Sequence, residues 1–179
     1  MLRYLPVNGW PASLDDMVDT FAGRLNVYGV MANHPALLRA WAGFRMHVVE
    51  GSSLDPQLSE VVILRTGHLL GSSYEWAHHV MRAEKLGMEE ARIASIRGPI
   101  GEMSVADRIL CGAVDQLFAH HRLDVETQEQ LSVLIGTEAT LDLMATVAHY
   151  MMLGFMLNSV PVPLDAPVAD HLTRRVSAR

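Results

Sequence analysis

Apolar residues recur at helical spacing along almost the whole chain, and this periodicity constrains the fold more than any other feature. Clusters of Gly, Pro and Ser separate the periodic segments, as at Gly51-Ser52-Ser53 and Gly98-Pro99-Ile100-Gly101. The alternation of apolar and polar residues that is typical of β-strands is absent. The sequence therefore predicts an all-α fold. Its 179 residues suffice for one core and are too few for two ordinary domains, so we expect one domain over 1–179.

Capping residues indicate where individual helices begin and end. Pro56 suits the first position of a helix that continues to Leu70, where Gly71 ends it. Ser72 then caps a helix that Gly87 ends. Further helices are expected over 13–32, 35–49, 89–96, 104–121, 126–135 and 138–158. Several prolines after residue 160 predict an extended tail over 161–179 with a fraying end.

The high apolar content of the chain predicts self-association. Half of the residues are hydrophobic and the mean hydropathy is +0.17. The segment 143–160 is apolar on most sides, and such a helix must be buried on most sides. No window reaches ~18 uninterrupted apolar residues, so a membrane partner is not expected. We therefore expect a homo-oligomer with this helix at subunit contacts; a monomer that encloses the helix centrally is the alternative.

Charge and cysteine content exclude other classes of partner and chemistry. The net charge is −6 and no basic stripe is present, so nucleic acid is not an expected partner. The N-terminal residues show no basic region followed by an apolar run, and we expect a cytoplasmic protein without a signal peptide. The single cysteine, Cys111, excludes an intramolecular disulfide and a Cys-x-x-Cys centre. Its apolar neighbours favour a buried packing residue over a reactive thiol.

The segment 60–87 carries the candidate chemistry. Glu75 and His79 are four residues apart and share one face of the expected helix. Glu60 lies on the preceding helix, which must pack back antiparallel across a very short turn. A carboxylate can therefore face a second carboxylate and an imidazole. This arrangement suits proton transfer, because burial and like charge raise the pKa of a carboxyl group towards neutrality.

The same residues also have structural interpretations. Ser72-x-x-Glu75 is a capping box in which each side chain binds a free backbone amide, and Tyr74 and Trp76 could be core aromatic residues. Glu75-x-x-His78 has the spacing of di-iron carboxylate bundles, but the chain holds no second Glu-x-x-His, so no metal is expected.

The two halves of the chain are similar at a shift of 70 residues. Glu60 then corresponds to Gln130, and His79 corresponds to His149, with 19 residues between the members of each pair. This similarity favours a bundle of two duplicated helical repeats in which only the first copy keeps the carboxylate. Chance similarity between helical segments is the alternative.

This segment resembles the carboxymuconolactone decarboxylase and AhpD-like alkylhydroperoxidase family. The pattern comprises Glu60 with Val62-Ile63-Leu64, Tyr74-Glu75-Trp76, His79, Ala83, Gly87 and the acidic pair Glu89-Glu90. An Asn26-Val27-Tyr28 lead-in precedes it, and the resemblance covers roughly 20–160. It implies an AhpD-like helical bundle of helix-pair repeats, assembled as a trimer or hexamer.

In redox members of the family, two cysteines lie between the glutamate and the histidine. Here Ser72 and Glu75 occupy those positions, and neither side chain can cycle through a disulfide. The resemblance therefore implies the branch without the cysteine pair, with no cofactor. In that branch Glu60, Glu75 and His79 are catalytic candidates, and Ser72, Tyr74, Trp76 and His78 are candidates for binding substrate.

Three functions follow from this interpretation. The first is a lyase (decarboxylase) or isomerase that acts on a small acidic or lactone compound. The second is an alkylhydroperoxidase-like antioxidant, which the missing cysteines disfavour. The third is a non-catalytic oligomeric scaffold, which would need no cavity at Glu60, Glu75 and His79.

Overall fold

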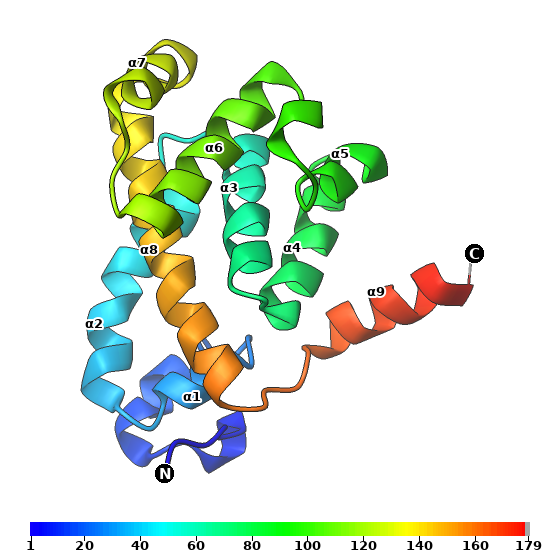
Figure 1. The fold of residues 1–179 in the computed structure, drawn as a ribbon. Helices are drawn as coiled ribbons and strands as arrows, with labels where there is room; N and C mark the ends of the chain where they lie inside the picture. The colour runs from blue at the N-terminus through cyan, green and yellow to red at the C-terminus, as the bar shows by residue number, and fades with distance from the viewer. Residues whose placement is uncertain (178–179) are drawn as a thin grey trace.

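A computed structural model describes residues 1–177 (Figure 1). This part of the chain forms helices joined by short connections and contains no β-strand, which confirms the all-α prediction. The α-helices are α1 (Tyr28–Met31), α2 (Pro35–Met46), α3 (Pro56–Leu69), α4 (Ser73–Lys85), α5 (Glu90–Ser95), α6 (Val105–His120), α7 (Val125–Leu134), α8 (Gly136–Ser159) and α9 (Ala166–Ser177).

The boundaries of α3 and α4 follow the local signals in the sequence. The Asp55 side chain accepts the backbone N–H groups of Gln57 and Leu58 and so caps α3. Gly71 has a φ of +65°, a conformation that only glycine adopts without strain, and it reverses the chain between α3 and α4. The Ser72 hydroxyl caps α4 by accepting the N–H of Glu75. The turn is therefore short, and α3 and α4 pack against each other.

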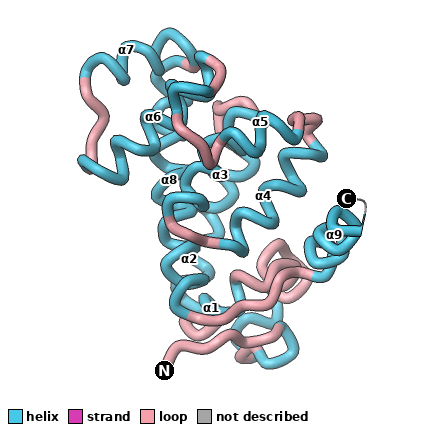
Figure 2. The backbone as a smooth tube through the Cα atoms, turned by 45° about the vertical axis from the view of Figure 1, so that its right-hand side comes forward, coloured by secondary structure: helices cyan, strands magenta, loops and turns pink. Residues whose placement is uncertain are grey.

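Helices α3 and α8 lie side by side in the middle of the molecule, as both views show (Figures 1 and 2). Two apolar clusters flank them. One lies among α3, α4, α6 and the first half of α8, which contributes Leu143 and Val147. The other joins the N-terminal segment and α2 to the second half of α8 through Tyr150 and Leu153. Helix α8 therefore belongs to both clusters.

This central position explains much of the apolar character of α8. By length and composition alone α8 could cross a membrane, but 44% of its most apolar window is buried inside the molecule. The core helix of a soluble protein has the same properties. Leu141 and Phe155 remain 62% and 56% exposed, so the chain itself does not cover every side of this helix.

Two predicted segments are wrong. The expected helix over 13–32 is a 3₁₀ segment, Ala12–Met17, followed by turns and the short α1. The Thr20 hydroxyl donates to the Met17 carbonyl, and the Asn26 N–H donates to Asp165, so backbone groups find partners outside a helix.

The expected extended tail is the second error. Its first residues are extended, but α9 begins at Ala166 with Pro167 in its first turn, where a proline needs no N–H partner. Helix α9 lies along α4 (Figure 2). The last two residues of the expected tail, 178–179, lie outside the described residues.

Candidate active site

The three residues proposed as catalytic meet at the interface of α3 and α4. His79 on α4 places Nδ1 2.6 Å from Oε2 of Glu60 on α3. Its Nε2 lies 3.5 Å from Oε2 of Glu75, one turn earlier on α4. All three side chains are buried. The imidazole is therefore held between two carboxylates, and Arg82 lies 3.2 Å from the second oxygen of Glu60.

The two carboxylates keep the imidazole protonated. Burial lowers the pKa of His79, but the charge of Glu60 and the hydrogen bonds to Glu60 and Glu75 outweigh it and raise the pKa to about 9. Near neutral pH the site thus holds a proton on His79 between two acceptors.

Glu75 has one oxygen without a partner. In a full capping box its carboxylate would accept the Ser72 N–H. That N–H instead donates to the Gly67 carbonyl at 2.9 Å, so only the Ser72 half of the box is formed. Oε1 of Glu75 is buried and makes no hydrogen bond. An unpaired buried carboxylate oxygen is costly, which points to a ligand or a reacting group as its partner.

A cavity of about 180 Å³ adjoins Glu75 and His79. Its walls come from the N-terminal segment, α1, α2, α4, α8, and the start of α9 with the residue before it. They include Tyr28, Arg45, Tyr74, Glu75, His78, His79, Arg82, His149, Tyr150 and Asp165. The cavity is smaller than a typical drug-binding pocket, so it suits a compact molecule.

His149 and Tyr150 on α8 form the wall opposite α4. The Tyr150 ring contacts the rings of His79 and His149 edge-on, with centroids 4.9 and 5.0 Å away. Burial, together with the charges of Arg45 and His79, lowers the pKa of His149 to about 3. The cavity wall therefore holds His79 as an imidazolium and His149 as a neutral imidazole.

A second buried network closes the cavity from the C-terminal side. The Tyr74 hydroxyl donates to Oδ2 of Asp165 at 2.6 Å, and Nε2 of His78 lies 2.7 Å from the same oxygen. Nδ1–H of His78 donates to the Tyr74 carbonyl. Burial raises the pKa of Asp165, but the bonds from His78, Tyr74 and the Asn26 amide bring it below its usual value. Asp165 thus joins the C-terminal segment to α4 as an ionised carboxylate.

The sequence profile of the carboxymuconolactone decarboxylase family matches residues 35–110. This range contains α3, the turn and α4, and with them Glu60, Glu75 and His79. Within this range the chain is similar to the carboxymuconolactone decarboxylase family. No curated protein sequence matches the chain.

Solved structures of similar fold include a debrominase and AhpD-like proteins. The apo debrominase Bmp8 superposes with a TM-score of 0.72 at 16% identity, covering 90% of this chain and 92% of that one. The AhpD core protein of Ralstonia eutropha JMP134, titled an uncharacterised peroxidase-related protein, gives 0.75 at 14% identity over 90% of each chain. An Agrobacterium tumefaciens protein of unknown function, assigned to antioxidant defence as AhpD, gives 0.63 at 17% identity over 71% of this chain and 89% of its own. These identities are low, so the likeness concerns the fold.

Among the residues expected to bind substrate, Tyr74 and His78 line the cavity, whereas Ser72 and Trp76 do not. Ser72 is buried as the cap of α4. Trp76 follows Glu75 by about 100° around the helix and so lies on a different side of α4. There the Arg97 guanidinium lies 3.6 Å from the centroid of the Trp76 ring. That Ser72 and Trp76 bind substrate therefore stays a prediction, and the lining of this cavity does not support it.

Glu60 also lies behind the cavity rather than in its wall. It lines a separate pocket with Arg82 and reaches the cavity only through His79. Its place in the structure is that of a residue that orients and charges the imidazole.

Sequence reasoning missed Arg45, Tyr150 and Asp165 as cavity residues. His149 was visible only as the counterpart of His79 in the proposed repeat. In the second proposed repeat, Gln130 stands where the first repeat has Glu60. Its side chain is exposed and donates to Glu126, not to His149. The contact between Glu60 and His79 is thus not repeated in the second half of the chain.

Two other candidate chemistries involve metal and thiol groups. Within residues 1–177 no group of three or more His, Cys, Asp or Glu side chains is arranged to hold a metal ion. Cys111 is fully buried in the core cluster around α3 and α6. Burial raises the pKa of its thiol to about 12, which disfavours the reactive thiolate.

Proposed function

We propose that this protein is a lyase, of the decarboxylase type, or an isomerase that acts on a small acidic or lactone compound by acid/base chemistry. The observation that carries the proposal is the buried Oε1 of Glu75, which lacks a partner and belongs to a residue of the cavity wall beside the protonated His79. A small cavity with an acceptor and a proton donor in contact favours an enzyme over a non-catalytic scaffold. We place the enzyme in the cytoplasm.

The proton steps follow from this geometry. In an isomerisation, Oε1 of Glu75 removes a proton from the carbon next to a carbonyl, and the electron pair of that C–H bond moves into the carbonyl. His79 then returns a proton, through Nε2, to another carbon of the same conjugated system. The proton taken up by Glu75 passes to Nε2 of His79, 3.5 Å from Oε2 of Glu75, and restores both groups. Glu60 holds Nδ1–H throughout and is a positioning residue.

A decarboxylation uses the same groups. The bond between the ring carbon and the carboxylate breaks, carbon dioxide leaves, and the electron pair moves into the conjugated lactone carbonyl. The ring carbon then takes a proton from the pair of Glu75 and His79. The substrate's own carbonyl accepts the electrons, so we propose a reaction without a cofactor.

Glu75→Gln tests the function, because glutamine keeps the size of the side chain but can neither take up nor relay a proton. We expect turnover of carboxymuconolactone, followed as release of carbon dioxide, and proton exchange into related lactone acids to fall by about 10²–10⁴-fold. Glu84→Gln is the matched control on the same helix, since Glu84 points to Arg175 and His171 outside the cavity. Full activity in both Glu75→Gln and His79→Ala would remove these residues from the mechanism.

A peroxide assay separates this function from the antioxidant activity that the names of some structural relatives suggest. With a dithiol donor, we expect no consumption of alkyl hydroperoxide, because Ser72 and Glu75 cannot form a disulfide and the Cys111 thiol is buried. Peroxide consumption that persists in Cys111→Ser would contradict the acid/base proposal.

A further inference from the structure

Three buried polar atoms without partners belong to residues that line one cavity. They are Oε1 of Glu75, Nδ1 of His149 and Nε of Arg45. The three residues are 4%, 1% and 9% exposed. Native proteins leave few such atoms, and three in the wall of one cavity indicate a ligand that satisfies them together.

The chemical types of these atoms define the ligand. The Nε–H group of Arg45 can only donate, and Glu75 as a carboxylate can only accept. The neutral ring of His149 can place its proton on Nδ1 and donate as well. The ligand therefore needs an oxygen that accepts from Arg45 and His149, and an acidic hydrogen for Glu75.

The charges of the wall indicate that this oxygen is anionic. Arg24, Arg45 and Arg82 line the cavity, together with Glu75 and Asp165. Asp165 is already occupied by Tyr74 and His78. An anion beside Arg45 gains a charge-assisted hydrogen bond in a site where burial strengthens it.

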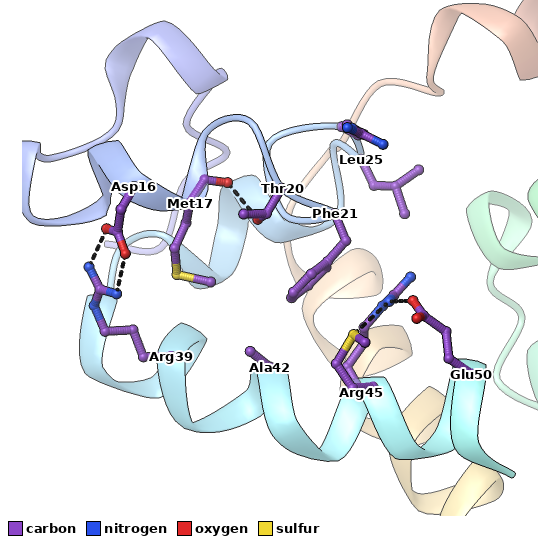
Figure 3. A pocket seen from close by; sticks show the side chains of 11 residues that line it. Asp16, Met17, Thr20, Phe21, Leu25, Arg39, Ala42, Arg45 and Glu50 are labelled. Atoms are coloured by element: carbon purple, nitrogen blue, oxygen red, sulfur yellow. Dashed lines mark hydrogen bonds and ion pairs between the residues drawn. The ribbon is translucent and has the colours of Figure 1, made fainter.

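Arg45 is also placed where a ligand would enter. An open groove of about 790 Å³ lies between the N-terminal segment and α2, as Figure 3 shows. The groove and the cavity share Arg24, Leu25 and Arg45. The Arg45 guanidinium lies over the Phe21 ring and pairs with Glu50, which is half exposed (Figure 3). This contact engages Nη1 and leaves Nε unpaired.

The volume limits the size of the ligand. A dry cavity of ~150 Å³ can hold a benzene molecule, so the cavity of about 180 Å³ accommodates one ring with a small substituent.

We propose that Arg45 and His149 form the anion-binding subsite of the cavity, which takes the carboxylate or enolate oxygen of a single-ring organic acid and directs the acidic hydrogen of that molecule to Glu75. The proposal rests on the proposed function for the role of Glu75, but the anion subsite can be tested without turnover.

The test compares benzoate with benzamide, and 2-furoate with 2-furamide, by isothermal titration calorimetry on the full-length protein. Each pair has nearly the same shape and differs in charge. We expect the acids to bind at least about tenfold more tightly than the amides. Arg45→Gln should remove this preference, and His149→Phe, which keeps a ring against Trp41, should reduce it.

Arg39→Gln is the matched control, because Arg39 lies on the same helix, lines only the outer groove and pairs with the exposed Asp16. It should bind benzoate like the wild type. If Arg45→Gln does not fold, as judged by circular dichroism, NMR spectra of the wild-type protein provide the test. Benzoate must then shift the ring resonances of His149, and benzamide must not.

Equal binding of acids and amides, equal effects of Arg45→Gln and Arg39→Gln, or no binding of either acid in the millimolar range would overturn the proposal. Failure of the catalytic proposal has a different signature. If Glu75→Gln keeps full turnover while Arg45→Gln loses benzoate, the acid/base mechanism is wrong and the anion subsite stands. If Glu75→Gln loses turnover while Arg45→Gln binds benzoate like the wild type, the anion subsite is wrong and the acid/base mechanism stands.

Discussion

At the scale of single residues, the unusual feature is a charged cluster in the interior of the bundle. Glu60 and His79 are almost fully buried, and burial of charged groups is unfavourable unless each one is paired. His79 is paired on both sides, and Arg82 completes the pairing of Glu60. Glu75 is the member whose pairing is incomplete, which is why we assign it the reacting proton.

The raised pKa of His79 predicts how stability depends on pH. Because the pKa is about 9 in the folded protein and about 6.5 in the unfolded chain, the folded state holds this proton more tightly. The contribution to the free energy of unfolding is therefore complete below pH ~6.5 and is lost as the pH rises through 9. We expect it to be on the order of 3 kcal/mol.

Denaturant unfolding of the wild type and of His79→Gln at pH 6 and pH 9.5 measures this contribution. The wild type should lose stability between these values relative to the variant, which cannot bind the proton. A constant difference between the two proteins across this range would mean that His79 is not held as an imidazolium.

At the scale of elements, one buried carboxylate, Asp165, joins the C-terminal segment to two other parts of the chain. Asp165 receives hydrogen bonds from Tyr74, His78 and the Asn26 amide, which lie on two other parts of the chain. Helix α9 follows immediately and lies along α4. We therefore expect this carboxylate to help hold the segment against the cavity.

Asp165→Asn tests that role. The amide carries no charge and cannot accept at both of its terminal atoms, so buried donors lose a partner and we expect the free energy of unfolding to fall by about 2–3 kcal/mol. Hydrogen exchange in α9 should accelerate more than exchange in α3. Asp170→Asn on the exposed side of α9 is the control and should leave both quantities unchanged. Equal exchange in the two variants would show that contacts along α4 hold the helix without Asp165.

At the scale of the whole molecule, apolar side chains remain on the outside. Leu141 and Phe155 on α8 are more than half exposed, and Val133 on α7 is 91% exposed. The central position of α8 accounts for its buried sides, so the argument for self-association now rests on these exposed residues alone. We propose that they lie at contacts between copies of the chain.

We expect light scattering to give the mass of a trimer or hexamer of the 19.8 kDa chain. Leu141→Glu with Phe155→Glu should reduce this mass while the helical circular dichroism stays unchanged, because a charge would be buried without a partner at the contact. Arg174→Glu on α9 is a control that changes charge on an exposed surface. A wild-type particle of 19.8 kDa would contradict the proposed assembly.

The sequence by itself determined the helices of the site and the pairing within it. Asp55, Gly71 and Ser72 set the ends of α3 and α4 through local hydrogen bonds and backbone conformation, which depend on neighbours a few residues away. A turn this short makes the two helices antiparallel. The spacing of Glu60, Glu75 and His79 then places their side chains in contact.

Only the tertiary structure decided which faces of those helices enclose a cavity. Trp76 and Ser72 share a segment with Glu75 but face elsewhere, whereas Arg45 and His149 come from helices far away in the sequence. Asp165 lies 87 residues from its partner His78. Contacts over such separations depend on how α2, α8 and the C-terminal segment pack against α4. That packing reflects the shapes of many side chains together, which no local pattern records.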